Sequence, residues 1–222
     1  MPSLVALSVV RTDAYRLADQ ENKLARFPEA EVDRYINKGR AEWWDILVST
    51  LGPSWLGKSA YLTTTANSSA VAWPDDFLKF VSADLCTSST SSDRTPLDAI
   101  GLEDTASWAN RPSGRPQVYF VYGEALEVYP KANRAYGLWL RYIPTAPQLE
   151  EGSDEFDTFN SWGDEYASTY AARRMAIKDG EIALAQALMA DLAGIVRRIQ
   201  ALAATRETHA PIRVRDIRRS RR

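Results

Sequence analysis

The amino-acid sequence predicts an α+β fold, in which a helical bundle carries an inserted antiparallel β-sheet or meander and an extended C-terminal tail. Apolar residues recur at a helical period near both ends of the chain, and they alternate with a period of two in the middle. We therefore expect an N-terminal helix pair at about 12–51, a β-rich insertion at about 60–148 and a helical hairpin at about 155–205. Together these are expected to form a single domain over residues 1–205, followed by an extended basic arm at 206–222.

The longer of the two N-terminal helices is predicted to follow Pro28. Its apolar residues lie three, four or seven positions apart: Val32, Ile36, Trp43, Ile46, Leu47 and Leu51. The pair Gly52-Pro53 then ends the helical pattern. A shorter helix is expected before it in TDAYRLADQENKLARF, with Thr12 or Asp13 as the capping residue.

The middle of the chain reads as strands and turns. AYLTTTA and FLKFVSADLCT are rich in residues that favour extended structure. In PQVYFVYGEALEVYPKANRAYGLWLRYIP, two sets of residues alternate with a period of two over 118–122, 126–129 and 136–143, with a tight turn at Gly123-Glu124. This pattern predicts an antiparallel meander of three strands, which ends before Pro144.

The C-terminal part predicts two antiparallel helices. GSDEFDTF supplies capping and acidic residues before the first helix, and the dipeptide Asp179-Gly180 breaks it. In the second helix one face is continuously apolar, through Ala185, Leu188, Leu192, Ile195, Ile199 and Leu202. This face is expected to pack against the early helix that carries Trp43.

The charge of the chain is unevenly distributed. The formal net charge is −2, but residues 206–222 carry seven Arg against Glu207 and Asp216, a net of +5, so residues 1–205 carry −7. The lone cysteine, Cys86, excludes an internal disulfide and is expected to be buried. No stretch approaches the roughly 18 apolar residues of a membrane span, and the first ten residues lack the features of a signal peptide. We expect a soluble protein with no membrane partner.

One motif invites a nucleotide-binding hypothesis. GPSWLGKS, residues 52–59, matches the G-x-x-x-x-G-K-[ST] loop that holds phosphate with backbone N–H groups and a lysine. That mechanism needs a strand before the loop and a helix after it. Here a helical pattern precedes the motif, and AYLTTTANSSAVAWP after Ser59 would form a poor helix. A helix end followed by a surface turn is the preferred interpretation, with a phosphate-binding loop as the alternative.

Other catalytic or metal-binding patterns are weak. His209, the only histidine, lies in the arm, so a catalytic triad would need that segment to fold over a site. The carboxylates at 150–157 lack the spacing of a calcium loop, and the dipole of the following helix accounts for them. We therefore predict no catalytic residue, no metal and no cofactor.

The chain is rich in aromatic residues, with seven Trp and ten Tyr. Trp, Tyr and Arg are enriched at protein interfaces, so an interface with another subunit or a partner protein is expected to use Tyr119, Tyr122, Tyr129 and Trp139. Base stacking on these rings is the weaker alternative, because Arg141 is the only basic residue that interleaves with them along the predicted meander.

The order of these parts resembles the head-to-tail adaptor, or connector, proteins of tailed bacteriophages. Two stretches carry the resemblance, WPDDFLKF and RPQVYFVYGEALEVYPKANRAYGLWLRYIPTAPQL. The second contains the features typical of such proteins: Arg115-Pro116, Tyr119, Gly123, Leu126, Tyr129-Pro130, Tyr136, Leu140, Tyr142, Pro144, Pro147 and Leu149. The resemblance extends from about residue 29 to 222.

The resemblance implies a non-enzymatic virion protein, found at the head–tail interface and in the host cytoplasm during assembly. Such adaptors form a ring of about twelve copies beneath the portal. The ring extends the channel for the double-stranded genomic DNA and docks the next neck or tail protein. The segment that matches the portal-binding arm is Thr208–Arg222, and its candidate docking residues are Arg213, Arg215, Arg218, Arg219, Arg221 and Arg222. A DNA-binding module that acts through this basic tail is the remaining alternative.

Overall fold

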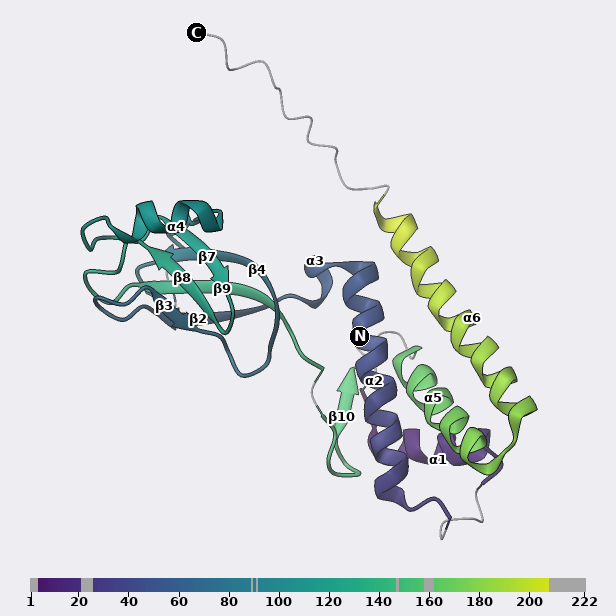
Figure 1. The fold of residues 1–222 in the computed structure, drawn as a ribbon. Helices are drawn as coiled ribbons and strands as arrows, with labels where there is room; N and C mark the ends of the chain where they lie inside the picture. Colours follow the sequence, from purple (N-terminus) through teal and green to yellow (C-terminus); the bar gives the residue numbers. More distant parts are fainter. Residues whose placement is uncertain are drawn as a thin grey trace. The chain divides into compact units, whose positions relative to one another are not determined.

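The computed structural model of the protein confirms the predicted α+β fold (Figure 1). It describes residues 4–20, 26–88, 90, 92–146, 148–157 and 162–207. The described residues up to Thr50 and from Gln148 onward form one compact unit, and the described residues from Leu51 to Ala146 form another. We call them the helical unit and the β-rich unit. The prediction of an extended arm falls outside the described residues, except that Arg206 and Glu207 belong to the last helix.

The described part of the helical unit contains long helices and a short two-stranded sheet. Its elements are β1 (Leu4–Ala6), α1 (Leu7–Leu17), α2 (Glu29–Leu51), β10 (Glu155–Asp157), α5 (Trp162–Asp179) and α6 (Ile182–Glu207). The break between α5 and α6 is confirmed. Gly180 has a φ of +85°, a conformation that side chains other than glycine rarely adopt, and it therefore ends α5 sharply.

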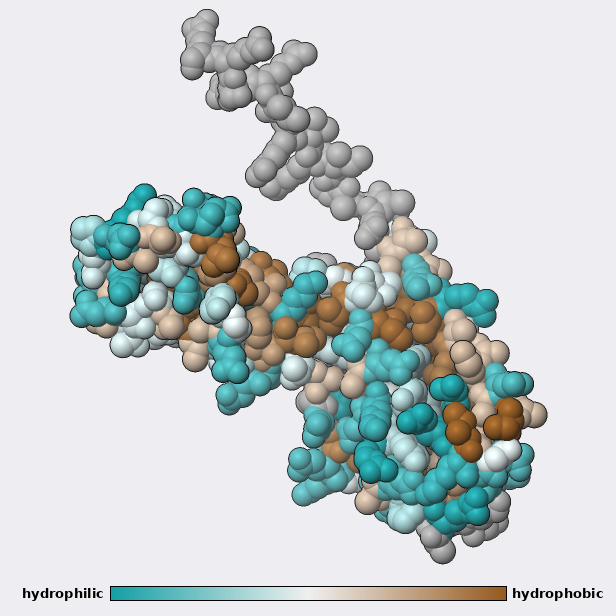
Figure 2. All heavy atoms as spheres, viewed as in Figure 1, coloured by the Kyte–Doolittle hydropathy of each residue, from teal (hydrophilic) through white to brown (hydrophobic). Residues whose placement is uncertain are grey.

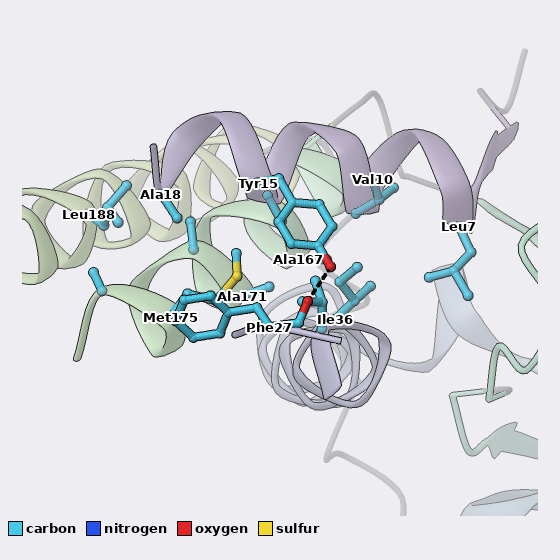
Figure 3. Close-up of a cluster of buried hydrophobic side chains, with 14 of the residues drawn as sticks. Leu7, Val10, Tyr15, Ala18, Phe27, Ile36, Ala167, Ala171, Met175 and Leu188 are labelled. Carbon is cyan, nitrogen blue, oxygen red and sulfur yellow. Dashed lines mark hydrogen bonds between the residues drawn. The ribbon is translucent and has the colours of Figure 1, made fainter. Parts of the chain in front are cut away.

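Apolar side chains from the N-terminal helices and the C-terminal hairpin share one core, as Figure 3 shows. Leu7 and Val10 of α1 and Ile36 of α2 are fully buried, together with Met175 of α5. Tyr15 contributes its ring to the same core and donates a hydrogen bond from its hydroxyl to the carbonyl of Phe27 at 2.7 Å. The predicted helical bundle is thus held by contacts between segments more than 100 residues apart.

Two predicted helix starts were wrong. Helix α1 begins at Leu7 rather than near Thr12, because Leu7 and Val10 already occupy the core-facing side of the helix. Thr12 does not cap α1; its hydroxyl instead donates to the carbonyl of Ser8. The hairpin was expected from about residue 155, but residues 155–157 are strand β10, which pairs antiparallel with β1. Strands of three residues carry too little alternation to be recognised in the sequence.

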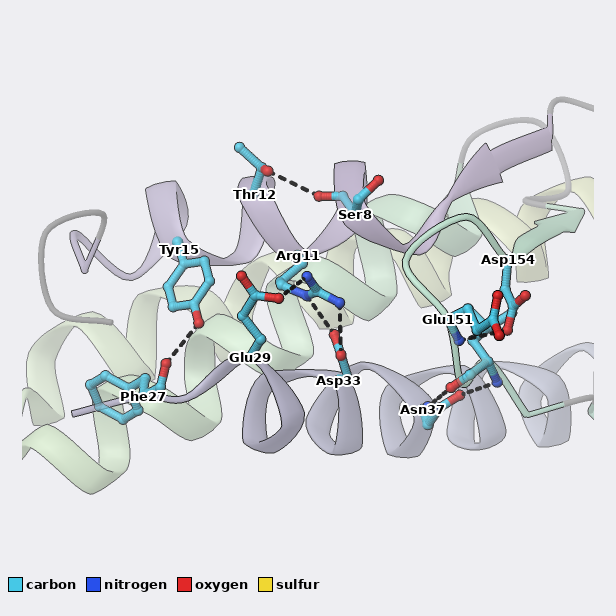
Figure 4. A network of polar contacts seen from close by, with 11 residues as sticks. Ser8, Arg11, Thr12, Tyr15, Phe27, Glu29, Asp33, Asn37, Glu151 and Asp154 are labelled. Atoms are coloured by element: carbon cyan, nitrogen blue, oxygen red, sulfur yellow. Dashed lines mark hydrogen bonds and ion pairs between the residues drawn. The ribbon is translucent and has the colours of Figure 1, made fainter. Parts of the chain in front are cut away.

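An ion-pair network joins α1 to α2 (Figure 4). The Arg11 guanidinium donates to both carboxylate oxygens of Asp33, at 2.7 and 2.8 Å, and it also contacts Glu29. Nearby, the Asn37 amide makes two hydrogen bonds to the backbone of Leu149, one as donor and one as acceptor. These contacts hold α2 against α1 and against the segment at Leu149.

Helices α2 and α5 approach each other closely at Gly39. A Cβ atom placed on Gly39 would lie 2.9 Å from the Cβ of Tyr170, so no larger residue fits without a shift. One turn further along α2, the rings of Trp43 and Tyr166 lie 5.3 Å apart. The Tyr166 hydroxyl donates to Glu42 at 2.9 Å, and burial raises the pKa of Tyr166 above its ordinary value. The close contact thus depends on the absence of a side chain.

The β-rich unit begins with a single helical turn and contains two four-stranded sheets. In chain order its elements are α3 (Pro53–Leu56), β2 (Lys58–Thr63), β3 (Ala70–Ala72), β4 (Phe77–Cys86), β5 (Arg94–Pro96), β6 (Asp98–Ala99), α4 (Leu102–Ala109), β7 (Val118–Tyr122), β8 (Ala125–Tyr129) and β9 (Gly137–Pro144). The strand orders are β2-β9-β4-β5 and β3-β8-β7-β6.

The predicted three-stranded meander was wrong in its last strand. Strands β7 and β8 form the expected hairpin, with Gly123 at a φ of +53° in the turn. Strand β9 does not pair with β8; it lies in the other sheet, between β2 and β4. The reason is that β3 already pairs with the second edge of β8, while β9 finds partners on both sides in β2 and β4.

The two sheets share one apolar core. Leu126 and Val128 of β8 pack with Leu138 and Leu140 of β9, and all four side chains are fully buried. As predicted, the lone cysteine Cys86 is buried at the end of β4.

Candidate functional site

The GPSWLGKS motif runs from the end of one helix into a strand. A phosphate-binding loop has the opposite order, with a strand before it and a helix after it. Helix α2 precedes it, its Pro-Ser-Trp-Leu stretch forms α3, and Lys58 begins strand β2. A Cβ atom on Gly57 would lie 2.6 Å from the carbonyl oxygen of Pro53, so this glycine permits the tight turn after α3. The motif therefore leads from a helix into a strand, and no helix follows Lys58 to direct its N-terminal N–H groups at a phosphate.

Lys58, the lysine of this motif, has a partner within the unit. Its Nζ lies 2.7 Å from the Oδ2 of Asp76, and the Tyr142 hydroxyl donates to the other carboxylate oxygen of Asp76 at 2.7 Å. The hydrogen bond from Lys58, followed by that from Tyr142, lowers the pKa of Asp76, and the bond to Asp76 raises the pKa of Lys58. Asp76 belongs to the WPDDFLKF stretch, so this stretch and GPSWLGKS meet at one polar contact.

Two of the four aromatic residues predicted for an interface lie inside the β-rich unit. Tyr119 packs on Phe80 of the other sheet, with ring centroids 4.9 Å apart. Tyr129 is only 6 % exposed, and its hydroxyl donates to Glu127. Burial and this hydrogen bond raise the pKa of Tyr129 to about 12. These two tyrosines stabilise the unit and expose little area to a partner.

Tyr122 is the exposed member of the predicted set. It lies at the end of β7 with 63 % of its surface exposed, and its ring stacks on that of Phe120, 6.0 Å away. Its neighbour Val121 is also exposed. Figure 2 shows hydrophobic residues gathered in patches among hydrophilic ones on the visible face. The hairpin end at Tyr122 therefore remains a candidate contact surface.

Trp139 is bordered by residues that the sequence did not connect with it. Tyr61 lies opposite Trp139 in the β2–β9 register, with ring centroids 6.4 Å apart. The guanidinium carbon of Arg94, on β5, lies 4.2 Å from the centre of the Trp139 ring. Only Arg141 was recognised as a basic neighbour from the sequence, because Arg94 lies more than forty residues earlier in the chain. No local pattern could have linked the two.

The acidic segment before the hairpin has a structural role. Asp154 accepts hydrogen bonds from the backbone N–H groups of Glu150 and Glu151, and these bonds lower the pKa of Asp154. These carboxylates were predicted to interact with the dipole of the following helix. Asp154 instead stabilises a turn within residues 150–154. In the described parts of the chain no group of three His, Cys, Asp or Glu residues is arranged to hold a metal ion.

The six arginines predicted to dock on a portal, Arg213 to Arg222, lie outside the described residues. The last described element before them is α6, which ends at Glu207. Among the described helices, none is long and apolar enough to cross a membrane.

Comparison with known protein families places these features in context. The chain matches the family described as SU10 adaptor protein over residues 6–215, which is most of its length. It belongs to this family of phage head–tail adaptors. The match confirms the resemblance that WPDDFLKF and the hairpin sequence suggested, and it extends to the N-terminal helices. A search of curated proteins finds no match to the adaptor.

Proposed function

We propose that this adaptor forms a ring of about twelve copies beneath the portal, extends the DNA channel and docks the next neck or tail protein. The observation that carries the proposal is the family match over residues 6–215, because phage adaptors of this kind join head and tail. A ring closed by head-to-tail contacts needs two unlike lateral faces on each subunit. The chain folds into two compact units, one helical and one β-rich.

The basic arm is the proposed portal-docking segment. The candidate docking residues of the arm are Arg213, Arg215, Arg218, Arg219, Arg221 and Arg222. Their guanidinium groups can donate bidentate hydrogen bonds to carboxylates, or donate to main-chain oxygens, of the portal. The arm contains few large apolar residues, so its affinity must come from polar and charged contacts with a partner, against the entropy cost of fixing the chain there. In this proposal the arm acts as a docking peptide, with passing DNA as a secondary partner.

The charge distribution supports a role around a DNA channel. Residues 1–205 carry a formal charge of −7, and an acidic wall would let duplex DNA slide without adhering. We place the assembled protein in the virion at the head–tail interface, and the free subunit in the host cytoplasm during assembly. The proposed role is structural and requires no catalytic step or cofactor.

The exposed aromatic residues are proposed contacts with a neighbouring subunit or tail component. Tyr122 offers the largest exposed ring of the four candidates, and Trp139 presents a ring already bordered by Arg94 and Tyr61. Tyr and Trp provide a large contact area at a low cost in conformational entropy. Tyr119 and Tyr129 would support such a surface from inside the β-rich unit.

Truncation after Thr208, with the portal as the partner, tests the proposal. Negative-stain images of the full-length protein mixed with portal should show rings with a central hole, and the truncated protein should be captured less well while its circular dichroism spectrum is unchanged. A full-length variant with the six arm arginines replaced by Gln separates the charge from the length of the arm. If the full-length protein is not captured by the portal, the proposed function is wrong. If capture is unchanged in both variants, the role of the arm is wrong.

A duplex-binding measurement separates the adaptor from a DNA-binding module. If the arm mainly binds DNA, truncation should remove a salt-dependent affinity for duplex DNA and leave portal capture intact. We expect the reverse, a loss of portal capture that exceeds any loss of duplex binding.

A further inference from the structure

A cavity of about 400 Å³ opens at one end of the β2-β9-β4-β5 sheet. It lies where the last residue of β4, Cys86, pairs with the first residue of β9, Gly137. Its wall combines hydroxyl groups, an aromatic ring and two guanidinium groups, from Thr87, Thr95, Tyr136, Arg115 and Arg134. We call this cavity the arginine pocket. None of its residues belongs to the predicted arm or to the GPSWLGKS motif.

The arginines at this pocket are held by uncharged partners. Arg115 donates to the hydroxyl of Thr95 at 2.9 Å, and the guanidinium of Arg134 lies 5.1 Å from the centre of the Tyr136 ring. Arg94, between the lining residues Asp93 and Thr95, lies over the ring of Trp139. Among the described residues no carboxylate forms an ion pair with Arg94, Arg115 or Arg134. A guanidinium has five donors, so each of these groups retains hydrogen-bonding capacity for a ligand.

The backbone fixes the two lining arginines relative to each other. The N–H of Gly114 donates to the carbonyl of Lys131 at 2.8 Å, and the N–H of Asn133 donates back to the carbonyl of Gly114 at 3.1 Å. Arg115 and Arg134 each follow one of these bonded residues directly. The loop that carries Arg134 is also tied to Thr64, whose hydroxyl accepts from the N–H of Tyr136 at 2.9 Å. The pocket is therefore preorganised, which lowers the entropic cost of binding.

The charge around the pocket favours an anion. Two arginines, Arg115 and Arg134, line it against one acidic residue, Asp93. Arg94 lies between the lining residues Asp93 and Thr95 in the sequence and adds a third positive charge nearby. Guanidinium groups form strong, often bidentate, hydrogen bonds with carboxylates and phosphates.

We propose that the arginine pocket binds a carboxylate side chain on an acidic segment of a protein partner of the adaptor. A recessed cavity can receive a protruding Asp or Glu side chain, whereas the phosphates of a duplex lie along a broad, continuous surface. The acidic character of residues 1–205 also disfavours approach by a polyanion as large as DNA. This inference rests on the proposed function, because an adaptor has protein partners on several sides.

Fluorescence anisotropy with fluorescein-labelled hexaglutamate tests the proposal. The peptide is tested against the full-length variant whose six arm arginines are replaced by Gln, so that the arm does not bind it. At low ionic strength this protein should bind the peptide, and the further double substitution Arg115→Gln/Arg134→Gln should weaken binding at least about tenfold. Substitution of both residues by Lys keeps the charge but removes the planar fork, so its affinity should be intermediate. Arg16→Gln/Arg198→Gln removes two exposed arginines of the helical unit and should leave the affinity unchanged within about twofold.

Three results would overturn the proposal. In the first, the peptide fails to bind the full-length protein with the substituted arm. In the second, the double Gln variant binds the peptide as tightly, and its circular dichroism spectrum shows that it is folded. In the third, a labelled DNA duplex binds more tightly than the peptide and loses its affinity in the same variant, which would make the pocket a nucleic-acid site. Portal capture is measured separately on the protein with its native arm. If portal capture of the parent protein fails, the proposed function fails; if capture succeeds and peptide binding fails, only this inference fails.

Discussion

The helical and β-rich units use arginine in two different ways. In the helical unit, Arg11 lies between α1 and α2 and pairs with Asp33, and both side chains are less than one-fifth exposed. In the β-rich unit, Arg115 and Arg134 lie at a cavity and contact only a hydroxyl and a ring among the described residues. In the first arrangement the charge of the arginine is paired and holds two helices together. The second leaves it available to a molecule from outside, so the partner of an arginine is a guide to its role.

The largest expected difference between the units concerns stability. Arg11→Met leaves the Asp33 carboxylate half-buried without its partner, and we expect a loss of about 2–3 kcal/mol in the free energy of unfolding. Arg115→Gln should change it by less than about 0.5 kcal/mol, because Arg115 is exposed and lies outside the core. Urea unfolding followed by circular dichroism measures both. Equal losses in the two variants would remove the distinction between a structural and an available arginine.

A smaller effect is expected where the helices touch. Gly39→Ala should destabilise the protein by about 1–2 kcal/mol, because the clash of the new methyl group with Tyr170 exceeds the gain in helix propensity. Gly194→Ala in α6 is the matched control, since a Cβ there meets no atom within 4 Å. It should stabilise the protein by about 0.5–1 kcal/mol. The same urea experiment decides, and a stabilising Gly39→Ala would show that α2 and α5 separate readily.

The smallest effect should depend on pH: the loss of stability in Asp76→Asn should be present at neutral pH and should disappear in acid. Hydrogen bonds from Lys58 and Tyr142 lower the pKa of Asp76 in the native protein. As the pH falls, the Asp76 carboxylate is therefore protonated in the unfolded chain at a higher pH than in the native protein. The stability that Asp76 contributes is present above the ordinary Asp pKa of about 3.9 and is lost as the pH falls through its lower native pKa. Asp76→Asn should therefore flatten the loss of stability below about pH 4.

Asp75→Asn, at the exposed neighbouring position, provides the control for Asp76→Asn. Its urea midpoint should follow that of the parent protein at every pH. An acid profile of Asp76→Asn identical to that of the parent would show that the contact with Lys58 is not formed in solution.

The sequence predicted the elements whose periodicity is local. The apolar spacing from Val32 to Leu47 marked α2, and the alternation on both sides of Gly123 marked the β7–β8 hairpin. It could not predict the pairing of β9, because its neighbours β2 and β4 lie more than fifty residues earlier and a strand pattern does not specify its partner. Three-residue strands such as β1 were missed for lack of a pattern.

The candidate surfaces were predictable only in part. Tyr122 was identified from composition and alternation, and it is exposed. Tyr129 shared the same pattern, but its position in the sheet buries it, and sequence alone could not separate the two. The arginine pocket was not foreseen, because Arg94, Arg115 and Arg134 come from three segments that only the fold brings together.

Cys86 gives the pocket an internal chemical reporter. It is the only cysteine in the chain, so a thiol-specific reagent modifies the protein at a single position. Burial and a raised pKa keep its thiolate scarce, which makes that reaction depend on momentary opening of the pocket wall. The rate of labelling at Cys86 therefore reports how often this end of the sheet opens, and the measurement needs no engineered cysteine.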